Sequence, residues 1–311
     1  MSRVITSFAT GYLRTTVTRD DDGTYLWTRR PGADRNGQIR VPHPLLHAAV
    51  ASAPTGRVAL TLPEPAEGGV TYRVRRFPPV ATLFLGLAGE VPELMRVAGD
   101  TLAATALTLA ALHAVPVPDV EVAAVPVGVR RLLNWLRGGR GPRGAAELHR
   151  RAHVVLGRDR LDLVESWCAI VGGRRVLLHG APGHGILLPV GDDPADAGAL
   201  LIGEDLAAGP PEFDLGWLIG ELVEFGHAGV KPGPLGRADY DALVHRLLDA
   251  YPAPLDRAAV GRVALLRFLT HTHDFSAYMG WHDTLDDYLS VLAGVIDAAT
   301  DGRLLLETSH R

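Results

Sequence analysis

One stretch of the sequence, residues 177–222, constrains the fold most, because apolar runs and turns follow one another there in a defined order. In chain order it holds Leu177-Leu178, a turn that begins at His179-Gly180, the apolar run 199–202, Gly203-Glu204-Asp205, a Gly-Pro-Pro turn, and Phe213-Asp214-Leu215. Short apolar runs bounded by glycine and proline predict buried strands, whereas the longer apolar run after Asp214 predicts a helix. The stretch therefore predicts a chain that mixes strands and helices.

The rest of the sequence divides into a strand-rich first part and a helix-rich second part. Alternation of apolar and polar residues predicts a mostly antiparallel sheet, with strands at 23–28, 57–62 and 70–74 and a hairpin or loop at 63–69. One helix is expected within 39–53, and Pro42 and Pro44 confine it to the portion after Pro44, because proline breaks a helix interior. Amphipathic spacing predicts helices at 92–113, 127–136, 145–156, 160–171, 214–227, 240–251, 257–271 and 284–299.

The order of motifs in residues 177–222 resembles that of the aminoglycoside phosphotransferase and choline-kinase-like families. The resemblance extends back to residues 102–116, whose Leu-Ala and Leu-His-Ala-Val-Pro pattern is similar to a helix that these kinases place after the nucleotide hinge. It implies an α+β, two-lobed protein-kinase-like (aminoglycoside phosphotransferase) fold. A small, β-rich N-terminal lobe is expected over residues 1–90, and a larger helical C-terminal lobe over residues 91–311 with the His-Gly loop and the Phe-Asp-Leu motif.

Most residues that carry the chemistry of such kinases are replaced here. In the resembling families one Asp orients the attacking hydroxyl, and an Asn and a second Asp hold magnesium on the nucleotide phosphates. These positions fall on Ala181, on Ile186, and on Ile202 or Gly203. The strand lysine that grips the phosphates is also missing, because the single lysine of the chain, Lys231, lies in a Gly-Pro loop.

Five residues remain as candidates for the site. Glu204 and Asp205 are the acids nearest to the vacated metal position, so they are candidate catalytic and magnesium-binding carboxylates, the alternative being a helix cap or a solvated turn. His184 is a candidate catalytic residue within the loop, or else a solvent-facing histidine. His179 and Asp214 are candidate loop-positioning residues, because the resemblance implies that this Asp accepts backbone N–H bonds from the loop.

Arginines are the candidate anion-binding residues of the chain. Arg73 and Arg75 lie on an alternating run, where an arginine can replace the lost strand lysine on phosphates. Arg137, Arg140 and Arg143 belong to the densest basic segment and are candidates for binding an acidic or phosphorylated peptide, since guanidinium groups bind such anions bidentately. The alternative for this segment is a solvated helix and loop surface.

Composition excludes several classes of protein. A net charge of −4 and a pI near 6.3 argue against a general nucleic-acid binder. A membrane span needs a run of about 18 uninterrupted apolar residues, and the sequence contains none. We also expect no signal peptide at its start. The single cysteine, Cys168, fits a reducing cytoplasm. Many Ala, Gly and Pro residues, with arginine in place of lysine, suggest a high-GC bacterial source.

Four features resemble the kinase-like component of actinobacterial class V lanthipeptide and thioamitide synthetases: the divergent loop, Gly-Glu-Asp, the run 209–222 and the Leu-Thr-His-Thr-His-Asp-Phe segment. That resemblance implies ATP- and magnesium-dependent phosphorylation of Ser or Thr in a ribosomal precursor (leader) peptide. A partner phospho-lyase subunit then eliminates the phosphate, so a heteromeric complex is expected. Two hypotheses remain open: an atypical kinase, or an inactive pseudokinase that binds the leader peptide or activates a partner enzyme.

Overall fold

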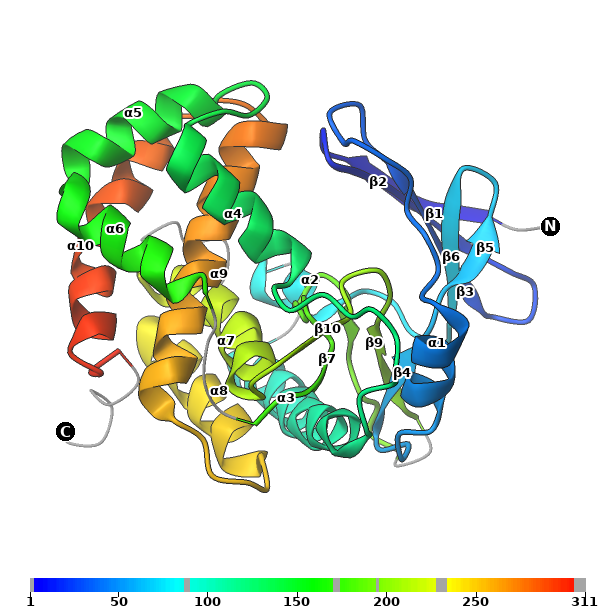
Figure 1. Cartoon of the computed structure of the whole chain (residues 1–311). Helices are drawn as coiled ribbons and strands as arrows, with labels where there is room; N and C mark the ends of the chain where they lie inside the picture. The colour runs from blue at the N-terminus through cyan, green and yellow to red at the C-terminus, as the bar shows by residue number, and fades with distance from the viewer. Residues whose placement is uncertain (1–2, 87–89, 170–173, 194–195, 228–233, 305–311) are drawn as a thin grey trace.

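The computed structural model describes residues 3–86, 90–169, 174–193, 196–227 and 234–304 (Figure 1). Lys231 and the end of the helix expected at 160–171 lie outside the described residues. Strands dominate the first part of the chain and helices the second, so the α+β class predicted from the sequence is confirmed.

The N-terminal part forms a five-stranded antiparallel sheet with the strand order β1-β2-β3-β6-β5. Its strands are β1 (Arg3–Ala9), β2 (Leu13–Arg19), β3 (Tyr25–Pro31), β5 (Glu64–Ala66) and β6 (Gly69–Val74). Residues 63–69 thus contain a short strand and a hairpin turn, one of the two expectations for that segment. On one face of the sheet Val17, Trp27 and Tyr72 form a small core with Leu188 and Leu201 of the C-terminal part.

A second sheet joins the two parts of the chain. β4 (Val58–Thr61) pairs in parallel with β9 (Gly198–Leu201), and β8 (Leu187–Leu188) pairs with the other edge of β9. The sequence predicted a mostly antiparallel arrangement for the strand at 57–62. The alternation of apolar and polar residues in a strand shows which residues share a face of the sheet, but it does not identify the neighbouring strand. A parallel partner that is distant in the sequence therefore cannot be predicted from the strand itself.

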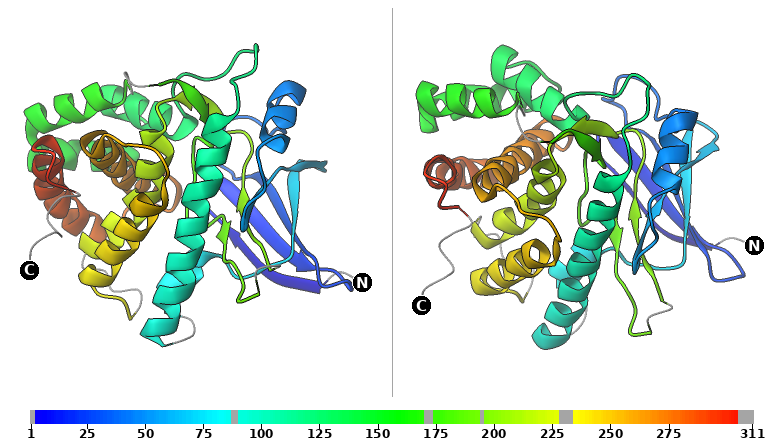
Figure 2. Two further views of the ribbon diagram at one scale, coloured as in Figure 1. Left: turned by 90° about the horizontal axis from the view of Figure 1, so that it is seen from below. Right: turned by 60° about the horizontal axis from the view of Figure 1, so that its bottom comes forward.

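Most of the helices gather on the other side of the molecule, whereas α1 (Pro44–Ala51) lies beside β4 (Figure 1). The others are α2 (Val80–Phe84), α3 (Val91–Ala114), α4 (Val127–Gly138), α5 (Ala145–Val155), α6 (Gly157–Trp167), α7 (Glu212–His227), α8 (Arg237–Ala250), α9 (Arg257–Tyr278) and α10 (Thr284–Thr300). β7 (Val176–Leu178) and β10 (Ala207–Gly209) form a two-stranded sheet before α7. Figure 2 shows α3 between the sheets and the other helices.

Close helix packing fixes the centre of the C-terminal part. A Cβ on Gly216 or Gly220 of α7 would lie 2.5 Å from a carbonyl oxygen of α9, so glycine lets these two helices approach closely. α3 is the one helix among the described residues that is long and apolar enough to cross a membrane, yet 61% of its apolar window is buried in the protein. Its burial is that of a core helix.

Candidate interlobe site

The turn after β7 is held by the first turn of α7. The backbone N–H groups of His179 and Gly180 donate to the two carboxylate oxygens of Asp214, over 2.7 and 2.9 Å. His113 of α3 contacts the same carboxylate at 3.0 Å, and Asp214 has no exposed surface. Gly180 has φ +83°, and a Cβ there would lie 1.8 Å from the Asp205 carbonyl oxygen, so only glycine fits this turn.

His179 acts as a buried spacer in this turn. Its Nε2 lies 3.0 Å from the carbonyl oxygen of Leu201 and therefore carries the proton, while Nδ1 accepts from the Ala181 N–H at 3.3 Å. Burial lowers the pKa of His179, so the ring is neutral. The structure thus brings together His179 and Asp214, the two residues that the sequence proposed for positioning the loop.

His184 lies in the same loop and is fully buried. Its Nδ1 lies 2.8 Å from the carboxylate of Glu221, its ring packs on Phe84, and its backbone N–H also donates to Glu221. Burial by itself would raise the pKa of Glu221, but Arg267 and His184 hold that pKa well below its usual range. The structure therefore places this histidine in a buried ion-pair network and does not bring it into contact with Glu204 or Asp205.

Glu204 and Asp205 follow β9, at the boundary between the two lobes. Glu204 Oε2 lies 2.6 Å from Arg35 Nη2, and the Arg35 side chain is only 8% exposed. Burial first, and then the charge of Glu204, raise the pKa of Asp205 to about 6. Within the described part of the chain, the Asp205 carboxylate makes no hydrogen bond.

Positive charge surrounds Asp205 from both lobes. The positive charges of three arginines lower the pKa of Asp205: Arg29 of β3, Arg35, and Arg131 of α4. Together they do not offset the rise in pKa that burial and the charge of Glu204 cause. Nε of Arg29, and Nε and Nη1 of Arg35, are buried and have no hydrogen-bond partner among the described residues. Buried N–H donors without partners are costly, so this centre is suited to an anionic ligand.

Tyr12 covers this centre from the β1–β2 turn. Its ring lies between the guanidinium groups of Arg35, at 4.6 Å, and Arg131, at 4.4 Å, and it packs on the Tyr278 ring at 5.0 Å. The neighbouring Gly11 N–H donates to the Tyr278 carbonyl over 2.9 Å. These contacts hold the turn of the N-terminal sheet against the end of α9. We call the group formed by Tyr12, Arg29, Arg35, Arg131, Glu204 and Asp205 the interlobe centre.

Arg73 and Arg75, proposed from the sequence for phosphate binding, lie elsewhere. Both line a separate groove of about 540 Å³ beside β6, and Arg73 is half-exposed, with Asp20 3.9 Å away. The sequence reasoning missed Arg29 and Arg35 in their place. A signal for Arg29 exists, since alternation puts it on the same strand face as the buried Trp27, whereas Arg35 follows β3 in a loop and has no periodic signal.

The basic segment is largely neutralised within the chain. Arg137 pairs with Glu165 at 2.7 Å, and Arg143 pairs with Asp34 at 2.9 Å. Arg140 is exposed and makes no hydrogen bond or ion pair to another described residue. The structure therefore does not assemble the three arginines into one free anion-binding surface.

The residues at the boundary fit a magnesium ion only as part of a nucleotide complex. Among the described residues no group of three or more His, Cys, Asp or Glu side chains is arranged to hold a metal. Magnesium on nucleotides, however, needs only one or two protein carboxylates, because phosphates and waters supply the other ligands. Glu204 and Asp205 provide that number, and the raised pKa of Asp205 indicates a carboxylate whose ionised form a cation would stabilise.

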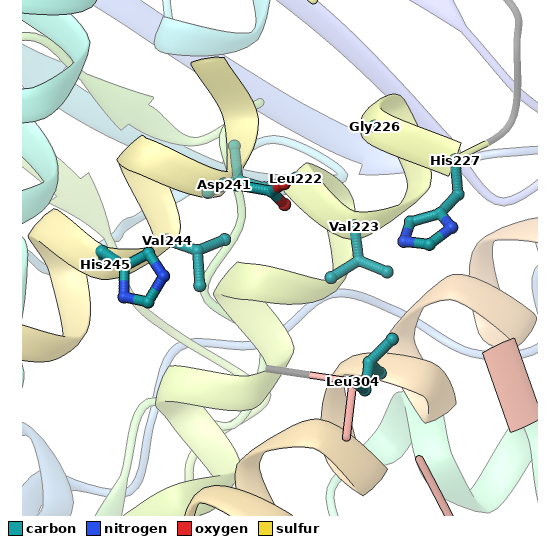
Figure 3. Close-up of a pocket in the computed structure, with 8 residues that line it drawn as sticks. All are labelled: Leu222, Val223, Gly226, His227, Asp241, Val244, His245 and Leu304. Carbon is teal, nitrogen blue, oxygen red and sulfur yellow. The ribbon is translucent and has the colours of Figure 1, made fainter. Parts of the chain in front are cut away.

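A further small cavity, between α7 and α8, has a volume of about 20 Å³ (Figure 3). Leu222, Val223, Val244 and Leu304 give it apolar walls, and His245 lies at its edge. This volume is about that of one water molecule, so the cavity does not suit an organic substrate.

No protein-family model and no curated protein matches the chain. Solved structures do. The amicoumacin kinase hAmiN, in complex with AMP-PNP, Ca2+ and Ami, matches with a TM-score of 0.55 and 12% identity, over 96% of this chain and 88% of that one. Aminoglycoside phosphotransferase APH(2'')-Ib, ADP-bound, matches with a TM-score of 0.54 and 10% identity, over 96% and 94%.

An ethanolamine kinase from Plasmodium vivax is also similar, with a TM-score of 0.54 and 13% identity, over 95% of this chain and 81% of that one. At such low identity these matches show the fold alone. The two-lobed, kinase-like fold of aminoglycoside phosphotransferases and choline or ethanolamine kinases, which the sequence predicted, is therefore confirmed.

Proposed function

We propose that this chain is an atypical kinase-like component of a peptide natural-product synthetase of the lanthipeptide type. It phosphorylates Ser or Thr of a ribosomal precursor peptide with ATP in the cytoplasm, and a partner lyase eliminates the phosphate. The observation that carries the proposal is the position of Asp205. This carboxylate lies between the lobes beside the Gly180 turn, without a hydrogen-bond partner in the described part of the chain.

Asp205 supplies the negative charge that is lost at Ala181 and at Ile202 or Gly203. It comes from the turn after β9, and its backbone contacts Gly180, where the phosphotransfer loop begins. With a pKa of about 6 the carboxylate is mostly ionised at neutral pH. It can then either act on the acceptor hydroxyl or hold a cation, and both roles need the ionised form.

Arg29 and Arg35 bind the phosphates in place of the missing strand lysine. Their buried N–H groups lack partners among the described residues, and a phosphate oxygen accepts such bonds strongly. Glu204 and Asp205 are the residues that would hold magnesium, and the ion would neutralise the phosphate charge. Catalysis in phosphoryl transfer consists mainly of such positioning and charge stabilisation.

The charge of the interlobe centre favours a neutral acceptor over a cationic amine. Ethanolamine and aminoglycosides, after which two of the similar structures are named, carry ammonium groups. Such groups would meet Arg29, Arg35 and Arg131 close to Asp205, and like charges repel. An uncharged peptide hydroxyl avoids this repulsion.

A pseudokinase is the second candidate, and the Arg35–Glu204 ion pair favours it. The pair occupies one of the two boundary carboxylates, and Tyr12 covers the arginine. In this alternative the chain binds the leader peptide or supports a partner enzyme and transfers no phosphate.

The test incubates the purified chain with magnesium, a candidate precursor peptide and a candidate partner lyase, with ATP or without it. Mass spectrometry follows phosphorylated and dehydrated peptide. ATP-dependent dehydration supports the kinase. If the chain binds the peptide but no ATP-dependent product forms with the lyase present, the pseudokinase would replace the kinase as the proposed function.

A further inference from the structure

The two outer edges of the N-terminal sheet differ. β5 ends the sheet on one side with three residues, among them Glu64 and Pro65, and proteins use charged residues and proline to block a sheet edge. β1 ends the sheet on the other side with seven residues, and it contains neither proline nor an acidic residue. Among the described strands it pairs with β2 alone, so its outer edge is open. Figure 1 shows this sheet on the side of the molecule away from α6 and α10.

The outer edge of β1 presents main-chain groups over residues 6–9. At the turn into β2 the Thr10 N–H donates to the Leu13 carbonyl over 2.8 Å. Hydrogen-bonded and non-bonded pairs alternate along an antiparallel ladder, so Ala9 and Ser7 direct their N–H and C=O groups away from β2. The irregular pairing of β1 lies N-terminal to this stretch. Open main-chain groups at a sheet edge are a template for an added strand.

The exposed side chains of β1 include two large apolar ones. Phe8 exposes 52% of its surface and Val4 exposes 60%. Phe8 is also the one aromatic side chain in the described part of the chain that is classed as exposed. An open edge with exposed apolar side chains promotes association with another chain.

The charge of the sheet near this edge is positive. β1, β2 and β3 together carry five arginines and no acidic residue. Arg14 of β2 lies directly opposite Arg30 of β3, on the face of the sheet away from Trp27. Their guanidinium groups donate to the carbonyl oxygens of Pro31 and Glu67, and neither pairs with a carboxylate of the described residues. Like charges directly opposite each other destabilise a sheet, so an acid beside them would stabilise it.

An acidic side chain on an added strand would lie close to Arg14. Ala9 is the residue of β1 opposite Arg14, and its small side chain leaves the space between them open. Neighbouring strands are about 4.8 Å apart, so an added strand lies about 10 Å from β2, which an arginine and a glutamate side chain span together. A second copy of the chain would instead bring five more arginines to this edge, and like charges repel.

We propose that the outer edge of β1 binds an extended, acidic segment of a partner peptide as an added strand. The segment forms main-chain hydrogen bonds with Ser7 and Ala9 and places its carboxylates beside Arg14. Phe8 and Ala9 point to opposite faces of the sheet, so the segment alternates an apolar side chain next to Phe8 with an acidic one next to Ala9. This inference goes beyond the proposed function and holds whether or not the chain transfers phosphate.

The first test uses a short fluorescein-labelled peptide of alternating Glu and Val, and a counterpart in which Lys replaces Glu. Fluorescence anisotropy measures the Kd of each for the wild-type chain. We expect the Glu peptide to bind about tenfold or more tightly than the Lys peptide, because only the Glu peptide complements the arginines. Equal binding of the two peptides, or no binding of the Glu peptide, would overturn the proposal.

The second test compares Ser7→Pro with Ser7→Ala. Proline removes an N–H that points away from β2, so the pairing of β1 with β2 is kept while the added strand loses a donor. Alanine removes the same hydroxyl and keeps the N–H, which makes it the matched control. We expect Ser7→Pro to raise the Kd of the Glu peptide about tenfold or more and Ser7→Ala to leave it unchanged. Equal Kd values in the two variants would show that the peptide binds elsewhere.

A measurement on the wild-type chain covers the case in which Ser7→Pro fails to fold. Hydrogen exchange of the Ser7 and Ala9 amides is compared with and without the Glu peptide. We expect slower exchange at both amides when the peptide is bound, and unchanged exchange would overturn the proposal. Light scattering gives the oligomeric state, for which we expect a monomer. A dimer that Ser7→Pro dissociates would assign the edge to a second copy of the chain and overturn the acidic partner.

Discussion

Arg35 Nη2 lies 2.6 Å from Glu204 Oε2, and this bond joins the loop after β3 to the turn after β9. The guanidinium is almost fully buried beneath the Tyr12 ring, and its two other nitrogens have no partner among the described residues. A buried guanidinium whose N–H groups lack acceptors lowers the free energy of unfolding of the protein. This cost is understandable if the donors serve a phosphate, as the proposed function requires.

We expect Arg29→Met and Arg35→Met to weaken nucleotide binding. Each change removes buried N–H donors that a phosphate accepts from, and a hydrogen bond to a charged group contributes about 1.5–3 kcal/mol. The measurement is titration calorimetry with ATP and magnesium. Arg73→Met and Arg75→Met are the controls, since both residues line a different groove.

The wild-type affinity in that experiment should itself be weak, because the boundary supplies only two carboxylates and one is paired with Arg35. A loss of affinity in Arg73→Met equal to that in Arg35→Met would show that the phosphate site has been assigned to the wrong arginines.

Asp205→Asn should stabilise the protein at neutral pH. The pKa of this carboxyl is raised to about 6 by burial and by Glu204, so the folded state binds its proton more tightly than the unfolded state does. Its ionisation therefore lowers the free energy of unfolding as the pH rises from about 4 to 6, by about 1–3 kcal/mol. Urea unfolding at several pH values measures the difference.

The gain from Asp205→Asn should be present at pH 7 and disappear below about pH 4, where the wild-type carboxyl is protonated in both states. A variant that is less stable than the wild type at pH 7 would mean that Asp205 has a stabilising partner in the folded chain.

Asp214→Ala should destabilise the fold whether or not the chain is a kinase. The change leaves the backbone N–H groups of His179 and Gly180 buried without an acceptor, at a cost of about 1–3 kcal/mol for each. Thermal unfolding measures the loss. Asp287→Ala, at an exposed position in the first turn of α10, is the control and should lose at most about 1 kcal/mol, the contribution of a carboxylate at a helix N-terminus.

The sequence was sufficient to predict the frame of the fold. The contact of Asp214 with the N–H groups of His179 and Gly180 joins residues 35 and 34 positions apart, and it was expected from the resemblance to the kinase families. Most helix bounds agree closely because residue patterns along the chain set them, as in α1, which begins at Pro44, although α9 continues to Tyr278, past its expected end at 271.

The interlobe centre could not be predicted in the same way, because its members come together only in the folded chain. Arg29 and Arg35 lie near Asp205 through the packing of one lobe on the other. His184 shows the reverse case, since its position in a polar loop indicated exposure while Glu221 of α7 and Phe84 of α2 bury it. The parallel pairing of β4 with β9 is equally non-local.

The most direct test of the central claim is the initial rate of phosphopeptide formation by Asp205→Asn, compared with Asp287→Asn, in the absence of the lyase. Asn has the shape of Asp and cannot be ionised, and no described residue donates to the Asp205 carboxylate, so the fold is preserved. We predict that Asp287→Asn matches the wild type and that Asp205→Asn loses about 100-fold or more of the rate. Wild-type rates in a folded Asp205→Asn variant would contradict the account.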